Sequence, residues 1–132
     1  MTNDFRRGVG IFLLNKEKKL WVGKRIDNMS DFWQMPQGGI DGDETPQEAM
    51  VRELAEEVGL KKNFQIVEES QDWLYYKLPD KLKKKVWNGK YVGQKQKWFV
   101  CKFFGSDSEI SLDNHKPEFL EWKWINPYES LD

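Results

Sequence analysis

Short apolar stretches that alternate with polar residues recur along the chain and predict a β-sheet. The stretches Val9 to Leu14 and Leu20 to Lys24 flank the polar residues 15–19 and predict a hairpin. Further strands are predicted at 33–35, 64–69, 73–78, 96–104 and 119–125. We therefore expect an α/β fold, with a mixed sheet and a helix on at least one face.

One segment has helical signals. Thr45 and Glu48 have the spacing of a capping box, Pro46 stands at the first helical position, and Gly59 predicts the end of the helix. At about 100° per residue, the helix has an apolar face and an acidic face. The apolar face comprises Met50, Val51, Leu54, Ala55 and Val58, and the acidic face comprises Glu53, Glu56 and Glu57.

The acidic face predicts a metal site. Glu53, Glu56 and Glu57 repel one another unless they are protonated or hold a cation, and carboxylate oxygens suit Mg²⁺ or Mn²⁺. A glycine loop at 38–42 precedes the helix. The alternative is a solvated charged face, but the loop, the cap and Arg52 beside the acids favour a site that holds a metal against a phosphate.

Length and composition fit one small domain spanning residues 1–132, with 39% hydrophobic residues. No apolar run approaches the length that spans a membrane, and the first residues lack the apolar segment of a signal peptide. The single cysteine, Cys101, lies in an apolar run and is predicted to be a buried strand residue. A cytoplasmic protein is expected.

The net charge of −1 conceals an asymmetry. Residues 77–97 contain eight lysines and one acid, a charge of +7, so the other residues together carry −8. This predicts an anionic partner larger than a metal ion, although a solvated lysine-rich loop is the alternative. Lys95 and Lys97 lie on one side of a predicted strand, and their charge argues against a side that faces the core.

The segment from Gly38 to Leu60 resembles the Nudix box at every fixed position. Those positions are Gly38, Glu44, Arg52, Glu53, Leu54, Glu56, Glu57, Gly59 and Leu60. The resemblance implies an α/β/α sandwich and hydrolysis, by water and a divalent metal, of a nucleoside diphosphate linked to another group. It also implies that Glu44 and Arg52 form a structural ion pair.

The same resemblance assigns roles to the acids. Glu53 and Glu57 would be metal ligands, Glu56 a further ligand or base, and the carbonyl of Gly38 a contributor to the metal site. Glu118, before the last predicted strand, would be an additional ligand or general base.

Residues 33–40 and 93–99 resemble the bacterial RNA pyrophosphohydrolase subfamily and its relatives that split diadenosine polyphosphates. The implied reaction removes pyrophosphate from the 5′ end of triphosphorylated RNA and leaves a monophosphate that is more readily degraded. Arg6, Lys95 and Lys97 would bind phosphates, and Gln37 would contact the substrate. Arg25 would contact a phosphate or stack on the first base.

A C-terminal helix typical of that subfamily is not found before Asp132. Two alternatives to the RNA activity stay open. The first is a dinucleoside polyphosphate hydrolase that uses the same metals. The second is a non-catalytic Nudix-like module that binds RNA or nucleotides, which the complete set of acids disfavours.

Overall fold

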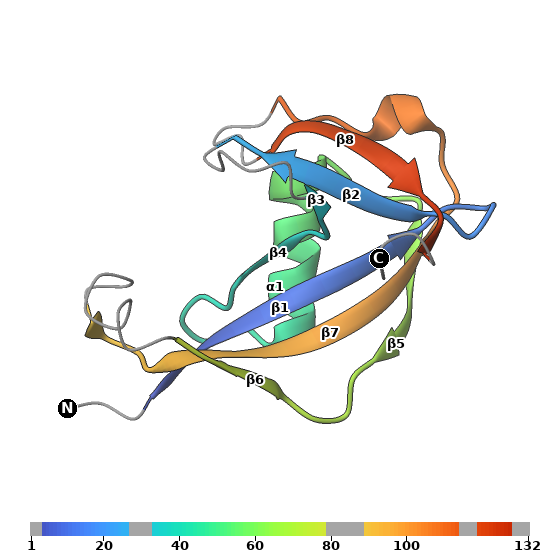
Figure 1. Cartoon of the computed structure of the whole chain (residues 1–132). Coiled ribbons are helices and arrows are strands. Elements are labelled where there is room, and N and C mark those ends of the chain that lie inside the picture. The colour runs from blue at the N-terminus through green and yellow to red at the C-terminus, as the bar shows by residue number, and fades with distance from the viewer. Residues whose placement is uncertain (1–3, 27–32, 79–88, 114–118, 128–132) are drawn as a thin grey trace.

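The computed structural model describes residues 4–26, 33–78, 89–113 and 119–127 (Figure 1). In these residues a mixed sheet is combined with one α-helix, as predicted. The strands are β1 (Phe5–Leu14), β2 (Leu20–Arg25), β3 (Trp33–Gln34), β4 (Gln37–Gly39), β5 (Phe64–Glu69), β6 (Leu74–Lys77), β7 (Gly93–Phe103) and β8 (Phe119–Ile125). The helix α1 (Pro46–Glu53) continues into a π-helical segment, Leu54–Val58, and a short 3₁₀ helix spans Asp107–Glu109.

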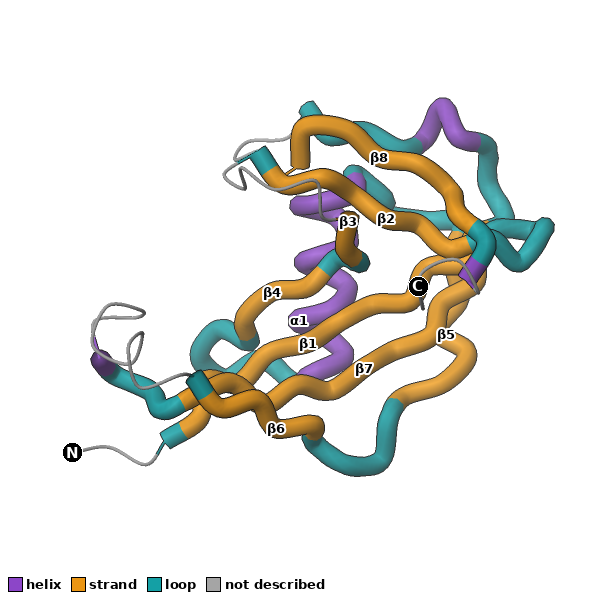
Figure 2. Tube along the Cα trace, in the orientation of Figure 1, coloured by secondary structure: helices purple, strands orange, loops and turns teal. Residues whose placement is uncertain are grey.

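The sheet has two arms that meet at the predicted hairpin (Figures 1 and 2). In one arm β1 pairs in parallel with β7 along its whole length, and β7 pairs antiparallel with β5 and β6. In the other arm β2 pairs with β3 and β8. The arms are joined where Leu14 pairs with Leu20. The hairpin is therefore confirmed, but its two strands separate soon after the turn.

The strand β4 was not predicted. The glycines of 38–42 predict a loop, whereas the structure pairs Gly38 and Gly39 with β1 in an antiparallel ladder. Two glycines carry no alternation of apolar and polar side chains, so the pattern that reveals the other strands is absent here. The pairing places this strand beside β1, and α1 contacts both strands.

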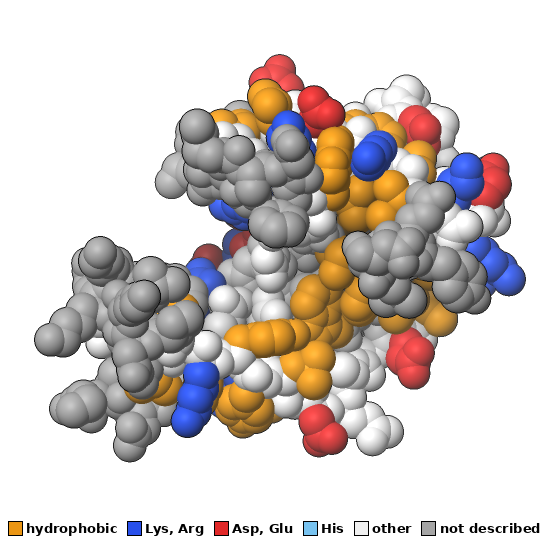
Figure 3. All heavy atoms as spheres, in the orientation of Figure 1, with side chains coloured by type: hydrophobic (Ala, Val, Ile, Leu, Met, Phe, Trp, Pro, Cys, Tyr) orange, Lys and Arg blue, Asp and Glu red, His pale blue; other side chains and the backbone are white. Residues whose placement is uncertain are grey.

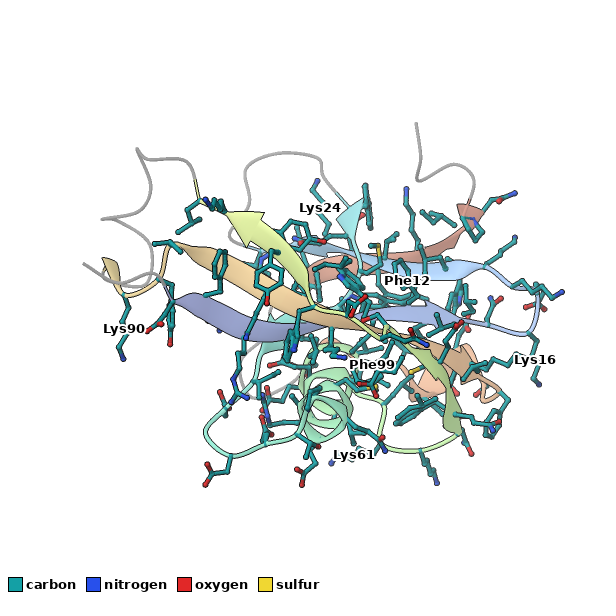
Figure 4. All side chains as sticks on the ribbon, turned by 90° about the horizontal axis from the view of Figure 1, so that it is seen from below. Phe12, Lys16, Lys24, Lys61, Lys90 and Phe99 are labelled. Carbon is teal, nitrogen blue, oxygen red and sulfur yellow. The ribbon has the colours of Figure 1, made fainter. Side chains whose placement is uncertain are left out.

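The core lies between the sheet and α1. Val9, Ile11 and Leu13 alternate along β1 and are fully buried, as are Phe99 and Cys101 on β7. Figure 4 shows Phe99 on the side of α1 and Phe12 on the opposite side. On that opposite face, hydrophobic side chains gather over β1, β7 and β8 (Figure 3), and no helix among the described residues covers them. The helical layer that is described thus covers one face of the sheet.

The start of the helix follows the prediction. The Thr45 side chain accepts a hydrogen bond from the Glu48 backbone, and the Glu48 side chain accepts one from the Thr45 backbone. The division into two faces is only partly correct. Val51 is exposed, whereas Glu53 and Glu57 are buried at 8% and 4% exposure, because these two acids turn toward β4 rather than toward solvent.

The helix ends at Gly59, whose φ of 80° is left-handed. A Cβ at this position would also lie 2.6 Å from the Ser111 carbonyl oxygen. Substitution of Gly59 by Ala is therefore expected to lower the free energy of unfolding by at least about 1–2 kcal/mol. Urea denaturation followed by circular dichroism measures the change, and an unaltered midpoint would contradict this account of the helix end.

Cys101 is buried on β7, as predicted, with its Sγ 3.8 Å from the Met50 Sδ. Burial raises the pKa of the thiol to about 12, so it stays protonated near neutral pH. We expect no reaction with a thiol reagent at pH 8 in the folded protein and full reaction in denaturant. Rapid labelling of the folded protein would show that the strand opens.

None of the helices in the described parts of the chain is long and apolar enough to cross a membrane.

Candidate active site

The two glycines of β4 bring oppositely charged groups against the backbone from opposite sides. Successive residues of a strand face opposite ways. A Cβ on Gly38 would overlap the carboxylate of Glu53, and a Cβ on Gly39 would overlap the guanidinium of Arg6. Neither glycine has a positive φ. The sequence requires glycine here because of close approach, not because of backbone conformation.

Arg52 joins this strand to the helix. Its Nε and Nη2 donate to the two Glu44 oxygens at 2.8 and 3.0 Å, which confirms the predicted ion pair. Nη2 also donates to the Gly39 carbonyl at 2.8 Å. The hydrogen bond from Arg52 holds the pKa of Glu44 below its usual range, and Glu44 in turn raises that of Arg52. The hydrogen bond to the Gly39 carbonyl links α1 to β4, and Glu44 holds the guanidinium in place for it.

The remaining nitrogen of the guanidinium contacts the predicted metal-binding acids. Arg52 Nη1 lies 2.9 Å from a Glu53 oxygen and 3.1 Å from a Glu56 oxygen. The Glu56 side chain is 57% exposed and is turned toward this guanidinium. Among the described residues, no three acidic, histidine or cysteine side chains converge on a point where a metal could be held. Glu53 and Glu57 are buried whereas Glu56 is exposed, and the metal-binding role of the three acids stays a prediction.

Glu53 and Glu57 form a buried acidic pair. Burial raises the pKa of the Glu53 carboxyl above its usual range, against the opposing effect of Arg52. Glu53 also shares a side-chain hydrogen bond with Glu57. Two carboxyls that share a hydrogen bond need a proton between them or a cation beside them. Carboxylate oxygens that need positive charge beside them suit a divalent cation.

A pocket of about 280 Å³ opens beside the acidic pair. It is lined by residues from β1, β2, β4, β7 and the helix: Arg6, Arg25, Gln37, Gly38, Gly39, Glu53, Glu57 and Gln94. Two arginines and two carboxylates thus face one small volume, although they are far apart in the sequence. Of the residues proposed from the sequence as substrate contacts, Arg6, Arg25 and Gln37 lie here.

Gln37 lines the pocket and is hydrogen-bonded to three other residues of the protein. Its backbone N–H donates to a Glu57 oxygen at 3.1 Å. Its side-chain amide donates to Gln34 and accepts from Gln96, both at 2.9 Å. The described geometry makes Gln37 a residue that orients Glu57, supported by two further glutamines that the sequence analysis did not single out.

Lys95 and Lys97 do not line this pocket. They share a face of β7 with Phe99, the face toward the core, whereas Gln94 and Gln96 point the other way. The expectation that the lysines avoid the core-facing side is wrong. Lys97 Nζ donates to the carbonyls of Ser70 and Gln71 at 3.1 and 2.7 Å, and both ammonium groups lie near the Trp73 ring. These partners satisfy the charges. Gln94 and Gln96 alternate with the lysines in the sequence, and this alternation could have indicated that the two glutamines face the side opposite to the lysines.

Two predicted parts of the site lie outside the described residues. These are Glu118 and residues 79–88 of the lysine-rich segment 77–97, which hold four of its eight lysines.

The fold and the acidic pair define a class of protein. A family model for the NUDIX domain matches residues 4–131. The chain belongs to the NUDIX family.

Two curated relatives are similar to this chain over most of its length. An RNA pyrophosphohydrolase of Pelagibacter ubique is 50% identical over 121 residues, which cover 92% of this chain and 76% of the relative. An RNA pyrophosphohydrolase of Orientia tsutsugamushi (strain Boryong) is 46% identical over 122 residues, covering 92% and 75%.

Solved structures are similar in fold. A C. elegans Ap4A hydrolase binary complex superposes with a TM-score of 0.71 at 20% identity, covering 96% of this chain and 83% of that one. The E. coli dihydroneopterin triphosphate pyrophosphohydrolase superposes with a TM-score of 0.72 at 18% identity, covering 96% and 85%. These likenesses support the NUDIX fold.

Proposed function

We propose that the protein is an RNA pyrophosphohydrolase. It uses water to split the phosphoanhydride chain at the 5′ end of triphosphorylated RNA, which releases pyrophosphate and leaves a 5′-monophosphate. The names of the relatives at 46–50% identity support this substrate. The observation that carries the proposal is the pocket in which Arg6 and Arg25 face Glu53 and Glu57.

The arginines suit the substrate, and the acids suit a metal. A triphosphate is a dense anion, and planar guanidinium groups bind phosphate oxygens with two parallel hydrogen bonds. Arg6 reaches the pocket from β1, and Arg25 reaches it from the end of β2. Their separate origins allow them to contact different phosphates of one chain.

Glu53 and Glu57 would hold a divalent cation, Mg²⁺ or Mn²⁺. When bound, such an ion neutralises phosphoryl charge and lowers the pKa of a coordinated water. Glu57 is held by the Gln37 backbone, and Glu53 is held by Arg52 and packs against Gly38. Both carboxylates are therefore oriented by the protein itself. Glu56 and Glu118 are proposed as a further ligand or base, as the family resemblance implies.

The test offers the protein, with Mg²⁺, 5′-triphosphorylated RNA and diadenosine tetraphosphate at equal concentrations. We expect faster hydrolysis of the RNA, with pyrophosphate as the released product. Faster hydrolysis of the dinucleotide would replace the proposal by a dinucleoside polyphosphate hydrolase. Binding of RNA without hydrolysis of either compound would indicate a non-catalytic module.

A further inference from the structure

Gln96 is a polar side chain in the interior of the protein, at 3% exposure. Its Nε2 donates a hydrogen bond to the Gln37 Oε1 at 2.9 Å. A buried amide destabilises the fold unless it is hydrogen-bonded, so the burial of Gln96 requires a contact of this kind. The strands that carry the two residues, β7 and β4, each pair with β1. The hydrogen bond therefore joins two strands across a third.

Two glycines of β1 make room for this contact. Gln96 pairs with Gly8, and Gln37 pairs with Gly10. Neighbouring strands lie about 4.8 Å apart, so the side chains of β7 and β4 have to cover about 10 Å over β1. A Cβ on either glycine would overlap side chains of β7. Because β1 has no side chains on this face at the two positions, the amides of β7 and β4 can meet above it.

A second hydrogen bond continues the contact into the other arm of the sheet. The Gln37 Nε2 donates to the Gln34 Oε1 at 2.9 Å, and Gln34 lies on β3, which pairs with β2. The backbone crosses between the arms here, through Met35 and the buried Pro36 (Figure 2). The side chains of Gln96, Gln37 and Gln34, which we call the glutamine bridge, thus link β7 to β3.

The ends of the glutamine bridge lie close to the two arginines of the acidic pocket. One end pairs with Gly8, two residues after Arg6, and the other end pairs with Gly23, two residues before Arg25. Two residues of a strand span about 6.6 Å. The strands β1 and β2 pair with each other beside their hairpin turn, far from both arginines. The bridge is therefore placed to set how far apart the two arginines lie.

We propose that Gln96 is a positioning residue that acts through the glutamine bridge. The bridge sets the separation of Arg6 and Arg25, which line the pocket from different arms of the sheet. It also holds Gln37, whose backbone N–H donates to Glu57 at 3.1 Å, and so orients a proposed metal ligand. This inference rests on the proposed function, in which one triphosphate contacts both arginines and the metal.

The first experiment measures binding without hydrolysis. The probe is a nucleoside triphosphate with methylene groups in place of the bridging anhydride oxygens, titrated by calorimetry in the presence of Mg²⁺. Gln96→Met keeps an unbranched side chain and removes the amide, and it is expected to weaken binding about tenfold, the effect of one lost hydrogen bond. Gln65→Met makes the same chemical change at an exposed residue of β5 and is expected to bind like the wild type.

Two further measurements separate positioning from a merely structural role. A structural role would lower the Tm of Gln96→Met but leave the folded protein with wild-type KM for triphosphorylated RNA, whereas positioning predicts a KM about tenfold higher. In a double-mutant cycle, Gln96→Met and Gln34→Met break the same bridge, so their combined loss of affinity is expected to be smaller than the product of the single losses. Circular dichroism confirms that each variant is folded.

Wild-type affinity and KM in Gln96→Met would overturn the inference, and continued hydrolysis of RNA by the wild type would leave the proposed function intact. Equal losses in Gln96→Met and Gln65→Met, or independent losses in the double-mutant cycle, would also overturn it. If the wild type does not hydrolyse RNA, the proposed function fails, and weaker binding of the probe by Gln96→Met would still support the bridge. If Gln96→Met does not fold, Gln34→Met, at the less buried end of the bridge, provides the same test.

Discussion

Glu57→Gln is expected to lower kcat on triphosphorylated RNA by a factor of about 100 to 1,000, or about 2.7–4 kcal/mol of transition-state stabilisation. The amide keeps the size of the side chain and an oxygen that can accept from the Gln37 backbone N–H. In the wild type this nitrogen lies 3.1 Å from a Glu57 carboxylate oxygen. It loses the charge with which Glu57 would hold a divalent cation. The loss should therefore fall on metal binding and turnover, not on the position of the helix.

Two measurements on this variant separate metal binding from folding. Mg²⁺ is expected to raise the Tm of the wild type, and this increase should be smaller for Glu57→Gln. Without metal, the variant should be at least as stable as the wild type, because a neutral amide costs less to bury than a carboxylate beside Glu53.

Glu68→Gln on β5 is the matched control, since it makes the same chemical change at an exposed acid. It should leave both kcat and the effect of Mg²⁺ unchanged. Turnover of Glu57→Gln equal to that of the wild type would remove Glu57 from the metal site.

The local parts of the fold were predictable because their causes lie within a few residues. The capping box at Thr45 and Glu48 and the stop at Gly59 are interactions along the chain, and the structure shows both. The strands β5 and β8 have the predicted bounds because alternation is also local. The π-helical turn at Leu54–Val58 has no comparable signal in the letters.

The parts of the site that depend on pairing between distant strands were not predictable from one sequence. Which side of β7 faces the pocket depends on its register with β1, where Arg6 pairs with Gln94 and Arg7 with Lys95. The family resemblance implied that Lys95 and Lys97 bind phosphates beside Arg6. In the structure Gln94 lines the pocket. The Lys97 ammonium group lies on the other face of β7, where it donates to the carbonyls of Ser70 and Gln71.

Gly38→Ala and Gly39→Ala should separate the metal-binding side of the site from the phosphate-binding side. A Cβ on Gly38 overlaps the Glu53 carboxylate, so Gly38→Ala has to displace a proposed metal ligand. We expect a loss of about 100-fold in kcat, the effect of a misplacement of about 1 Å at a reacting centre, together with a smaller increase in Tm on adding Mg²⁺.

Gly39→Ala is the matched variant, since it adds the same methyl group to the same short strand. Its Cβ overlaps the Arg6 guanidinium instead, so KM for triphosphorylated RNA should rise while the increase in Tm with Mg²⁺ stays at the wild-type value. The contrast follows from strand geometry, because neighbouring residues of β4 face opposite sides. Identical effects of the two substitutions on KM, kcat and the response to Mg²⁺ would contradict this separation. The carboxylate on one face of β4 and the guanidinium on the other would then not have distinct roles in metal binding and phosphate binding.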